Sequence, residues 1–379
     1  MGFNGNCKNE ITLQKSLGKG LEMHIVCTKE NLLKGFQAVS KAVASRAILP
    51  ILGNVRFEGT VDNKLKLSAT DLEIGVEVFV ETQVLTPGVI TIPARALQDI
   101  IAKLPNSDIE LKTNESNTET LLKCQKSKYN LKSIVADDFP PLPQLDQEHA
   151  VFVNAEMLAV GIRKTIFAAS TDTTKNILNG VKINLADGKV EMAATDGYRL
   201  AVKKLSIESK NENGFSVIVP SRALNELSRL LNSTKDEMVA VSQLSNQLVF
   251  SIDDKVLSTR LIEGQYPDYN RIIPSNLDKE IVFDRTELLN SVDRVSAISS
   301  IDKVNIVKME IKNGEVYLSA STPELGQSSE SLEIDYQGDH FEINFNARFL
   351  MDGLKNFDDE KVRFQLGGSL SPGLLKGID

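Results

Sequence analysis

The 379-residue sequence contains no tryptophan, only three cysteines and three histidines, and no long apolar run. The cysteines are Cys7, Cys27 and Cys124, and the histidines are His24, His149 and His340. The cysteines form no CxxC pair, which is typical of a protein kept reduced in the cytoplasm. The histidines are far apart in the chain and fit no metal-ligand or triad spacing. No apolar segment approaches the roughly 18–20 residues that span a bilayer, so we expect no membrane association.

Catalytic motifs are equally scarce, since the sequence has no GxSxG, HExxH or complete P-loop. The most enzyme-like feature is Asp71 and Asp196, each closing an ATD triplet at the end of a predicted strand. Such a carboxylate can act as a nucleophile or hold Mg²⁺, which would suit a metal-dependent hydrolase or transferase. Aspartate also closes tight turns by bonding its own backbone, and its recurrence favours that interpretation. We therefore predict no cofactor and no metal site.

The length is too great for one hydrophobic core and suits two or three domains. Hydrophobic residues make up 41% and charged residues 25% of the sequence, as in ordinary globular proteins. Residues 1–22 have no apolar segment and precede a strand-like stretch that begins at Met23. We treat them as an N-terminal extension whose role the sequence leaves open.

One strand-to-helix junction occurs three times. VIVPSRALNEL starts at Val217, ITIPARALQDI at Ile90 and INFNARFLMDG at Ile343, which are 127 and 126 residues apart. The strand endings LSATD (67–71), MAATD (192–196) and LSAST (318–322) recur in the same order at similar offsets. Landmarks that keep both order and spacing predict three copies of one structural unit.

Each unit combines helices with antiparallel strands. Segments 29–46 and 94–104 carry apolar residues at helical spacing, whereas 64–71 and 75–84 alternate with period two. The sequence thus predicts an α+β protein with six helices, in which each unit is two similar halves of one helix and three or four strands. We expect domains at 23–143, 150–270 and 271–379, joined by turn-rich segments.

The third unit is shorter than the others. Its second half, from Ala347 to the end, has 33 residues, whereas the corresponding span is 41 residues in the first two units. We therefore expect the third unit to lack its final strand.

The net charge of −8 is unevenly distributed. The six predicted helical windows, at 29–46, 94–104, 155–170, 221–231, 284–300 and 346–357, together carry +6 and leave −14 elsewhere. Solvation of exposed faces would explain one basic helix. The recurrence of Arg95, Arg222 and Arg348 at one position of every unit instead favours a shared surface that binds phosphate without reading sequence. Further basic residues on these helices are Lys29, Lys34, Lys41, Arg163, Lys164, Arg229, Arg294 and Lys355.

Four motifs, together with the three-fold repeat, resemble those of a known protein family. They are ATDGYRLAV (194–202), RAILPILGNV (46–55), ADDFPPLP (136–143) and EGQYPDYNRIIP (263–274). Over residues 23–379 the chain resembles the β subunit of bacterial DNA polymerase III, the sliding clamp family. The resemblance implies a head-to-tail homodimer that closes a ring, with helices inside and sheets outside. Such a ring would encircle duplex DNA and tether a polymerase without catalysis of its own. A protein-only repeat scaffold is the remaining alternative.

Site residues follow where positions match the family. The expected DNA-contacting residues are Arg46, Arg95, Arg222, Arg348, Asn346 and Lys41. The expected partner-peptide pocket comprises Leu178, Thr195, Gly197, Arg199, Leu200, Pro267, Arg271 and Ile272, with less weight on Tyr198. At the dimer interface we expect Tyr129 and Leu131 near Ile298, and Lys126 and Lys128 near Glu324 and Glu330.

The implied partners are double-stranded DNA, a second copy of the chain, the polymerase α subunit, a clamp loader and other proteins with a clamp-binding motif. We expect a cytoplasmic protein. Clamps usually end with an apolar strand and a tail that forms one wall of the peptide pocket. Without that strand, we expect weaker peptide binding and a less stable third domain.

Overall fold

The computed structural model of the chain describes residues 22–45, 49–207, 214–301, 305–312 and 314–378. Arg46 and Cys7 lie outside these residues. No helix in the described part of the chain is long and apolar enough to cross a membrane. Contacts divide the chain into two compact units. Unit 1 comprises the described residues of 1–162, 182–191 and 204–263, and unit 2 those of 163–181, 192–203 and 264–379.

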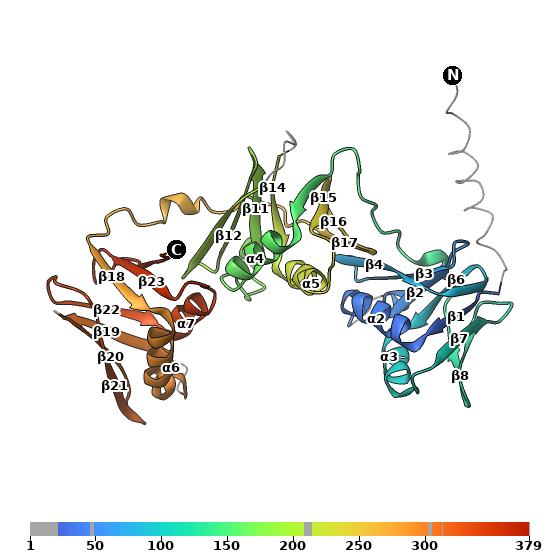
Figure 1. The fold of residues 1–379 in the computed structure, drawn as a ribbon, viewed down its shortest axis with the longest axis horizontal. Helices are drawn as coiled ribbons and strands as arrows, with labels where there is room; N and C mark the ends of the chain where they lie inside the picture. Colours follow the sequence, from blue (N-terminus) through green and yellow to red (C-terminus); the bar gives the residue numbers. More distant parts are fainter. Residues whose placement is uncertain (1–21, 46–48, 208–213, 302–304, 313, 379) are drawn as a thin grey trace, which may run out of the picture. The chain divides into compact units, whose positions relative to one another are not determined.

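Six α-helices occur in the described residues, as the sequence predicts (Figure 1). They are α2 (Lys29–Val39), α3 (Ala94–Lys103), α4 (Ala155–Ile166), α5 (Ser221–Leu231), α6 (Arg285–Ile301) and α7 (Ala347–Lys355). Short 3₁₀ helices are η1 (Ser40–Ala42), η2 (Pro50–Gly53), η3 (Ala136–Asp138), η4 (Asn176–Asn179) and η5 (Tyr269–Arg271). Helix α2 begins after Thr28, whose hydroxyl accepts a hydrogen bond from the Asn31 amide. Pro93 directly precedes α3. Proline is tolerated at this position because it removes no hydrogen bond of the helix.

Unit 1 contains two antiparallel sheets. The first has the order β5-β1-β7-β8-β9. Its strands are β1 (His24–Thr28), β5 (Gln83–Thr86), β7 (Asp108–Thr113), β8 (Glu119–Cys124) and β9 (Ser127–Lys132). The second has the order β10-β15-β16-β17-β4-β3-β2-β6. Its strands are β2 (Asn54–Gly59), β3 (Lys64–Thr70), β4 (Ile74–Glu81), β6 (Gly88–Pro93), β10 (Val151–Asn154), β15 (Met238–Leu244), β16 (Gln247–Ile252) and β17 (Lys255–Arg260). The eight-stranded sheet runs from the first sequence repeat into the second, because β17 pairs with β4.

The remaining sheets are smaller. One has the order β13-β12-β11-β14, with β11 (Gly180–Ala186), β12 (Lys189–Thr195), β13 (Leu200–Ser206) and β14 (Phe215–Pro220). Unit 2 holds β21-β20-β19-β22, with β19 (Ile306–Lys312), β20 (Glu315–Thr322), β21 (Gly326–Glu333) and β22 (Phe341–Asn346). Its other sheet, β18-β23-β24, has β18 (Lys279–Asp284), β23 (Lys361–Leu366) and β24 (Leu374–Gly377). Strand β24 follows β23 as β8 follows β7, and no described strand of the third repeat corresponds to β9 or β17.

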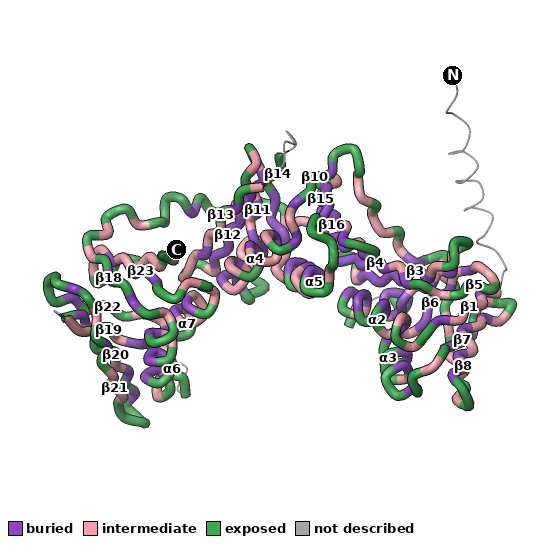
Figure 2. The backbone as a smooth tube through the Cα atoms, in the orientation of Figure 1, coloured by how far each residue is buried: buried purple, intermediate pink, exposed green. Residues whose placement is uncertain are grey.

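Helices bury one side against these sheets. In unit 2, α6 packs on β20 and β21, and Leu288, Val292 and Val295 of α6 are buried in one apolar core with Phe283 and Phe364. Full burial of a side chain of this size stabilises by about 1.5–3 kcal/mol. Figure 2 shows the same division, with strands largely buried and connecting loops exposed. The core thus holds α6 against its sheet, while Asp293 and Arg294 on the other side of this helix are exposed.

Candidate functional site

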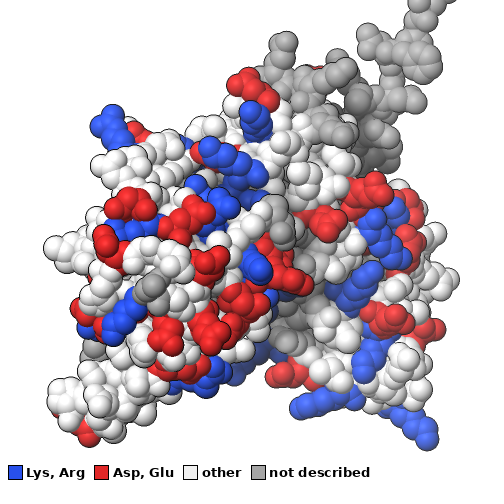
Figure 3. Space-filling view, turned by 60° about the vertical axis from the view of Figure 1, so that its left-hand side comes forward, with Lys and Arg blue, Asp and Glu red and all other residues white. Residues whose placement is uncertain are grey.

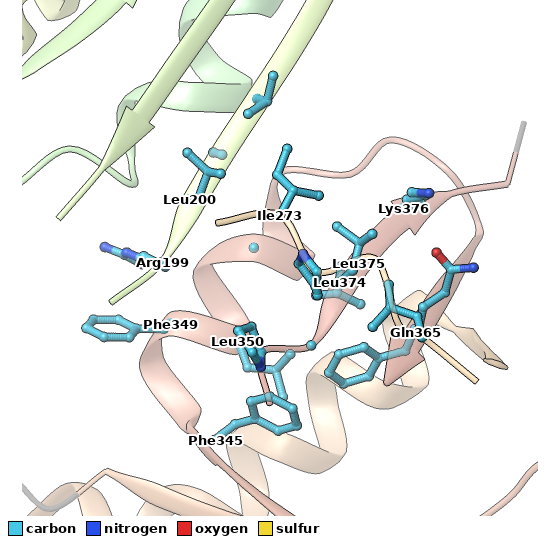
Figure 4. Close-up of a pocket in the computed structure, with 18 of the residues that line it drawn as sticks. Arg199, Leu200, Ile273, Phe345, Phe349, Leu350, Gln365, Leu374, Leu375 and Lys376 are labelled. Carbon is cyan, nitrogen blue, oxygen red and sulfur yellow. The ribbon is translucent and has the colours of Figure 1, made fainter. Parts of the chain in front are cut away.

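A cavity of about 1590 Å³ lies in unit 2. Most of its lining comes from the start of β13, residues 273–277, the β22–α7 junction and residues 369–377. The end of α4, the end of α7 and strand β23 add further residues. Figure 4 shows the apolar side chains of Leu200, Ile273, Phe345, Leu374 and Leu375 around it. Polar groups at its edge include Arg199 and Asn346. A hollow that combines apolar side chains with many polar groups suits a short extended peptide, which offers both apolar anchors and backbone hydrogen-bonding groups.

Arg199 is the most heavily bonded side chain of this cavity. Its Nη1 donates to Asp352 Oδ2 at 2.7 Å, its Nη2 to the Phe167 carbonyl at 2.7 Å and its Nε to Asp196 Oδ2 at 3.1 Å. The guanidinium lies 4.4 Å from the centre of the Phe349 ring, an arrangement visible in Figure 4. Only 18% of the side chain is exposed. Arg199 therefore holds α7 and the ATDGYR loop together within unit 2.

The ATDGYR loop is a tight turn fixed by side-chain hydrogen bonds. Asp196 Oδ1 accepts from the amides of Tyr198 and Arg199 at 2.9 and 3.0 Å. The buried Tyr266 hydroxyl accepts from the Thr195 amide at 3.1 Å, and burial raises the pKa of Tyr266 to about 12. The loop leaves Tyr198, which lines the cavity, 80% exposed. An exposed aromatic ring on a rigid turn is suited to contact a ligand.

Asp71 forms the same turn in unit 1. Its Oδ1 accepts from the amides of Glu73 and Ile74 at 3.0 and 2.9 Å. The turn interpretation of both aspartates therefore agrees with the geometry. Among the described residues, one group could hold a metal ion, namely the largely exposed Glu310, His340 and Glu342, and it includes neither aspartate. The other two histidines lie beside single carboxylates, His24 at Glu110 and His149 at Asp146.

The structure brings together only part of the predicted pocket. Arg199 and Leu200 line the cavity, and so does the low-weighted Tyr198. The others are outside its lining: Leu178, Thr195, Gly197, Pro267, Arg271 and Ile272. Thr195 and Gly197 belong to the turn beside it, and Ile272 is 54% exposed. Phe345, Phe349, Leu374 and Leu375 also line the cavity and are not among the predicted residues, because apolar character in sequence does not distinguish a cavity wall from a core.

The predicted DNA-contacting residues fall into two groups. Lys41, Arg95 and Arg348 are exposed, and none forms an ion pair with a residue that the structure describes. Two further basic residues of the helices, Lys34 and Lys355, are also exposed and form no ion pair with a described residue. The second group, Arg222 and Asn346, already has hydrogen-bond partners within the chain. Arg222 contacts Asp71 and the Lys41 carbonyl, and Asn346 caps α7 by accepting from the Phe349 amide. Arg46 lies outside the described residues. In the view of Figure 3, basic and acidic side chains are interspersed, so charge is not segregated there.

Further basic residues of the helices are also paired. Arg229 donates to the Ala38 carbonyl and pairs with Glu226. Arg163 and Lys164 both pair with Asp358, and the hydrogen bonds that they donate hold the pKa of that carboxyl below its usual range. Arg294 pairs with Glu330. Lys29 donates to the Leu104 carbonyl. Among the described residues, many basic side chains of the helices are therefore already engaged within the chain.

Several of the expected dimer residues lie on strands at two sheet edges. Tyr129 and Leu131 are half-buried on β9, which ends the five-stranded sheet of unit 1. Glu330 lies on β21, which ends a sheet of unit 2. Ile298 packs on the core beneath α6, and Glu324 is in the exposed loop before β21. Lys126 lies in the turn between β8 and β9.

Family models match nearly the whole described chain. They are the N-terminal, central and C-terminal domains of the DNA polymerase III beta subunit, at residues 23–143, 152–268 and 270–379. The beta sliding clamp of Synechococcus elongatus is 34% identical over 361 residues, which cover 94% of this chain and 96% of the relative. The chain belongs to the DNA polymerase III beta subunit family.

Solved structures of the family agree. The Bacillus subtilis sliding clamp has a TM-score of 0.90 at 28% identity, covering 95% of this chain and 96% of its own. The Pseudomonas aeruginosa clamp, solved bound to griselimycin, has a TM-score of 0.88 at 31% identity, covering 95% and 96%. The α+β class with three clamp domains is thereby confirmed. This family member functions as a sliding clamp, a non-catalytic processivity factor, and the hydrolase and scaffold hypotheses are set aside.

Proposed function

We propose that two copies of the chain join head to tail, encircle duplex DNA and slide along it while polymerase and other proteins dock on their surface. The observation that supports the ring is that β9 and β21, which carry the expected dimer residues Tyr129, Leu131 and Glu330, are both end strands of their sheets in a chain of this family. An open strand edge favours association with another strand, and two different edges allow the contact to repeat until a ring closes.

Contact with DNA would come from the exposed cations that form no ion pair with a described residue, namely Lys34, Lys41, Arg95, Arg348 and Lys355, together with Arg46. Such side chains bind phosphates through charge and therefore ignore base sequence. This property suits a ring that must move along any duplex. The engaged Arg222 and Asn346 would contribute less than the sequence predicts, because their polar atoms already have partners within the chain.

Partner proteins would dock in the unit 2 cavity. An extended peptide could place apolar side chains between Leu200, Phe345 and Leu375, while Tyr198 covers its edge. The polymerase α subunit, the clamp loader and other proteins with a clamp-binding motif are the partners we infer. The cytoplasm is the compartment we infer, and the unbridged, buried Cys27 and Cys124 are compatible with its reducing conditions.

Topological retention tests the ring. The clamp is placed on a nicked circular plasmid by a bacterial clamp loader and ATP, and gel filtration then separates bound from free protein. We expect co-elution with the circle and loss of protein after one restriction cut. A complex that survives linearisation, or that forms equally without loader and ATP, would show binding without encirclement.

A further inference from the structure

The large cavity of unit 2 is lined by two strands that each end a sheet. Strand β13 ends the sheet β13-β12-β11-β14, and β24 ends the sheet β18-β23-β24. Every residue of the lining belongs to unit 2. We propose that the partner peptide enters this cavity as a β-strand that pairs with β13 on one side and with β24 on the other. This inference rests on the peptide docking proposed above and specifies the form in which the peptide binds.

The eight-stranded sheet of unit 1 shows the arrangement that such a peptide would complete. There β17 lies between β16 and β4, and it joins the three strands β10-β15-β16 to the four strands β4-β3-β2-β6. The sheets that end at the cavity also have three and four strands, and each strand holds the corresponding place in its repeat. One added strand between β24 and β13 would therefore build a second sheet with the same order.

The register against β13 follows from the internal repeat. Asp71 and Asp196 close the same turn, so Ile74 corresponds to Arg199 and the next residues follow in step. In unit 1, β17 pairs with the five residues 74–78. Their counterparts are residues 199–203, and all five of these line the cavity.

The register against β24 leads to a strand of the same length. Strands β10 and β18 both end directly before a helix, so their ladders with β15 and β23 align residue by residue. Following the ladders onward, residues 248–252 of β16, which face the same part of β17, correspond to residues 373–377. All five of these residues also line the cavity. Two separate alignments thus place one five-residue strand against the walls of one cavity.

The size of the cavity suits a peptide. Its volume of about 1590 Å³ exceeds the roughly 300–1,000 Å³ that is usual for small-molecule sites. Figure 4 shows Leu200 of β13 and Leu375 of β24 among its side chains. A strand that adds to a sheet edge gains affinity from main-chain hydrogen bonds and specificity from alternate side chains.

The third position of the added strand calls for a large apolar side chain. In unit 1 this position is Leu257, which is fully buried between Val76 and Phe250. In the cavity its neighbours would be the buried Ala201 and Leu375, which packs on the unit 2 core. Burial of an apolar side chain there would anchor the peptide.

The other positions call for acidic and small side chains. The first would lie opposite Lys203 and the second opposite Lys376, and neither lysine forms an ion pair with a residue that the structure describes. Acidic residues at these positions would give both charges a partner. At the fourth position, Ser258 fits in unit 1 because Gly75 opposite it has no side chain. Leu200 takes the place of Gly75 in the cavity, so a small residue is required.

A synthetic peptide tests this pattern. The probe is acetylated and amidated SEELAVS, whose residues EELAV occupy the five positions, and fluorescence anisotropy measures its binding to the chain. The matched control SELEAVS has the same composition but exchanges the second and third positions. Because successive side chains of a strand face opposite sides, the control would place a carboxylate against Leu375. We expect the control to bind at least about tenfold more weakly, and equal affinities would overturn the register.

Methylation of peptide nitrogens tests pairing at both edges. In unit 1, Arg260 donates to the Glu73 carbonyl on the β4 side, and Leu261 donates to the Asn246 carbonyl on the β16 side. By this alternation, the fourth amide of the added strand would donate to β13 and the third to β24. Methylating either nitrogen should weaken binding about five- to tenfold, whereas methylating the N-terminal serine nitrogen should not. A loss at only one of the two positions would overturn insertion between the strands.

A proline substitution tests the β13 edge from the protein side. Phe79 donates to the Asp254 carbonyl, so the backbone N–H of Glu77, two residues earlier, also faces β17. Val202 is the counterpart of Glu77, and proline at an end strand removes this donor without breaking the ladder behind it. Val202→Pro should weaken SEELAVS binding at least about fivefold relative to Val202→Ala, with both variants folded by denaturant unfolding. Equal binding by the two variants would contradict pairing at β13.

The outcomes separate strand insertion from docking. Peptides that bind but are insensitive to nitrogen methylation would overturn strand insertion and leave docking in place. Binding of a polymerase α-subunit peptide without binding of SEELAVS would also overturn the strand assignment. If neither peptide binds the chain, docking in this cavity and strand insertion both fail.

Discussion

Arg199 shows how a residue predicted to bind a partner can serve the fold as well. Its three nitrogens donate to Asp196, Asp352 and the Phe167 carbonyl, and the ring of Phe349 covers its face. Few of its donors remain for a ligand. Its main effect is therefore to set the positions of the ATDGYR loop and α7, which both line the cavity.

Replacing this residue tests that role. Arg199→Ala should lower the free energy of unfolding by about 2–4 kcal/mol, because Asp352 and Asp196 lose the cation that compensates their charge in a partly buried place. Denaturant unfolding measures the change. Arg163→Ala removes a more exposed arginine and should lower the free energy of unfolding by less than about 1 kcal/mol. Equal effects of the two variants would contradict a special position for Arg199.

Glu330 makes a contribution to the stability of the folded protein that depends on pH. Arg294 and the Ser291 hydroxyl lower its pKa from 4.5 to about 2. Because the folded pKa is depressed, the stabilisation is present above the unfolded pKa and is lost as pH falls from about 4.5 toward 2. The free energy of unfolding of Glu330→Gln should therefore be about 1 kcal/mol lower than that of the parent at pH 7, a value that allows for solvent screening. Near pH 2 the two proteins should have the same free energy of unfolding. A difference that persists unchanged at pH 2 would rule out titration of this carboxyl as its source.

At the level of elements, the sequence was most informative where patterning was regular. Alternation over 64–71 and 75–84 predicted strands, and the structure has β3, β4 and the start of β5 there. The repeated junctions at Pro93 and Pro220 predicted helix starts, and α3 and α5 begin directly after them. Local sterics decide these starts, because a proline fixes its own backbone and gives up no helical hydrogen bond.

The β17–β4 ladder is the element that links the first two repeats. Leu257, opposite Val76, is fully buried, whereas its neighbour Val256 is only partly buried. Leu257→Ala should cost about 2–4 kcal/mol in unfolding free energy, and Val256→Ala distinctly less. Both values come from denaturant titration with an unchanged slope. A larger loss for Val256→Ala would mean that the opposite face of β17 carries the packing.

At the level of the whole molecule, DNA affinity should depend on a few exposed cations that form no ion pair with a described residue. Neutralising Lys34, Lys41, Arg348 or Lys355 to alanine should reduce the slope of log affinity against log salt by about 0.9 for each phosphate that is no longer neutralised. Fluorescence anisotropy at several salt concentrations measures it. Lys204→Ala is the control, since Lys204 lies on strand β13 and pairs with Glu191. A slope that changes equally for Lys204→Ala would contradict a helix-borne DNA surface.

The sequence by itself determined the repeat, the α+β class and the family, because these depend on local periodicity and on motifs that keep their spacing. Only the tertiary structure decided which basic residues are already paired and which apolar residues line the cavity. Arg222 and Arg348 occupy equivalent places in sequence, yet one meets Asp71 and the other has no ion-pair partner among the described residues. Pairing depends on what a distant segment brings within a few ångströms, and no local pattern carries that information.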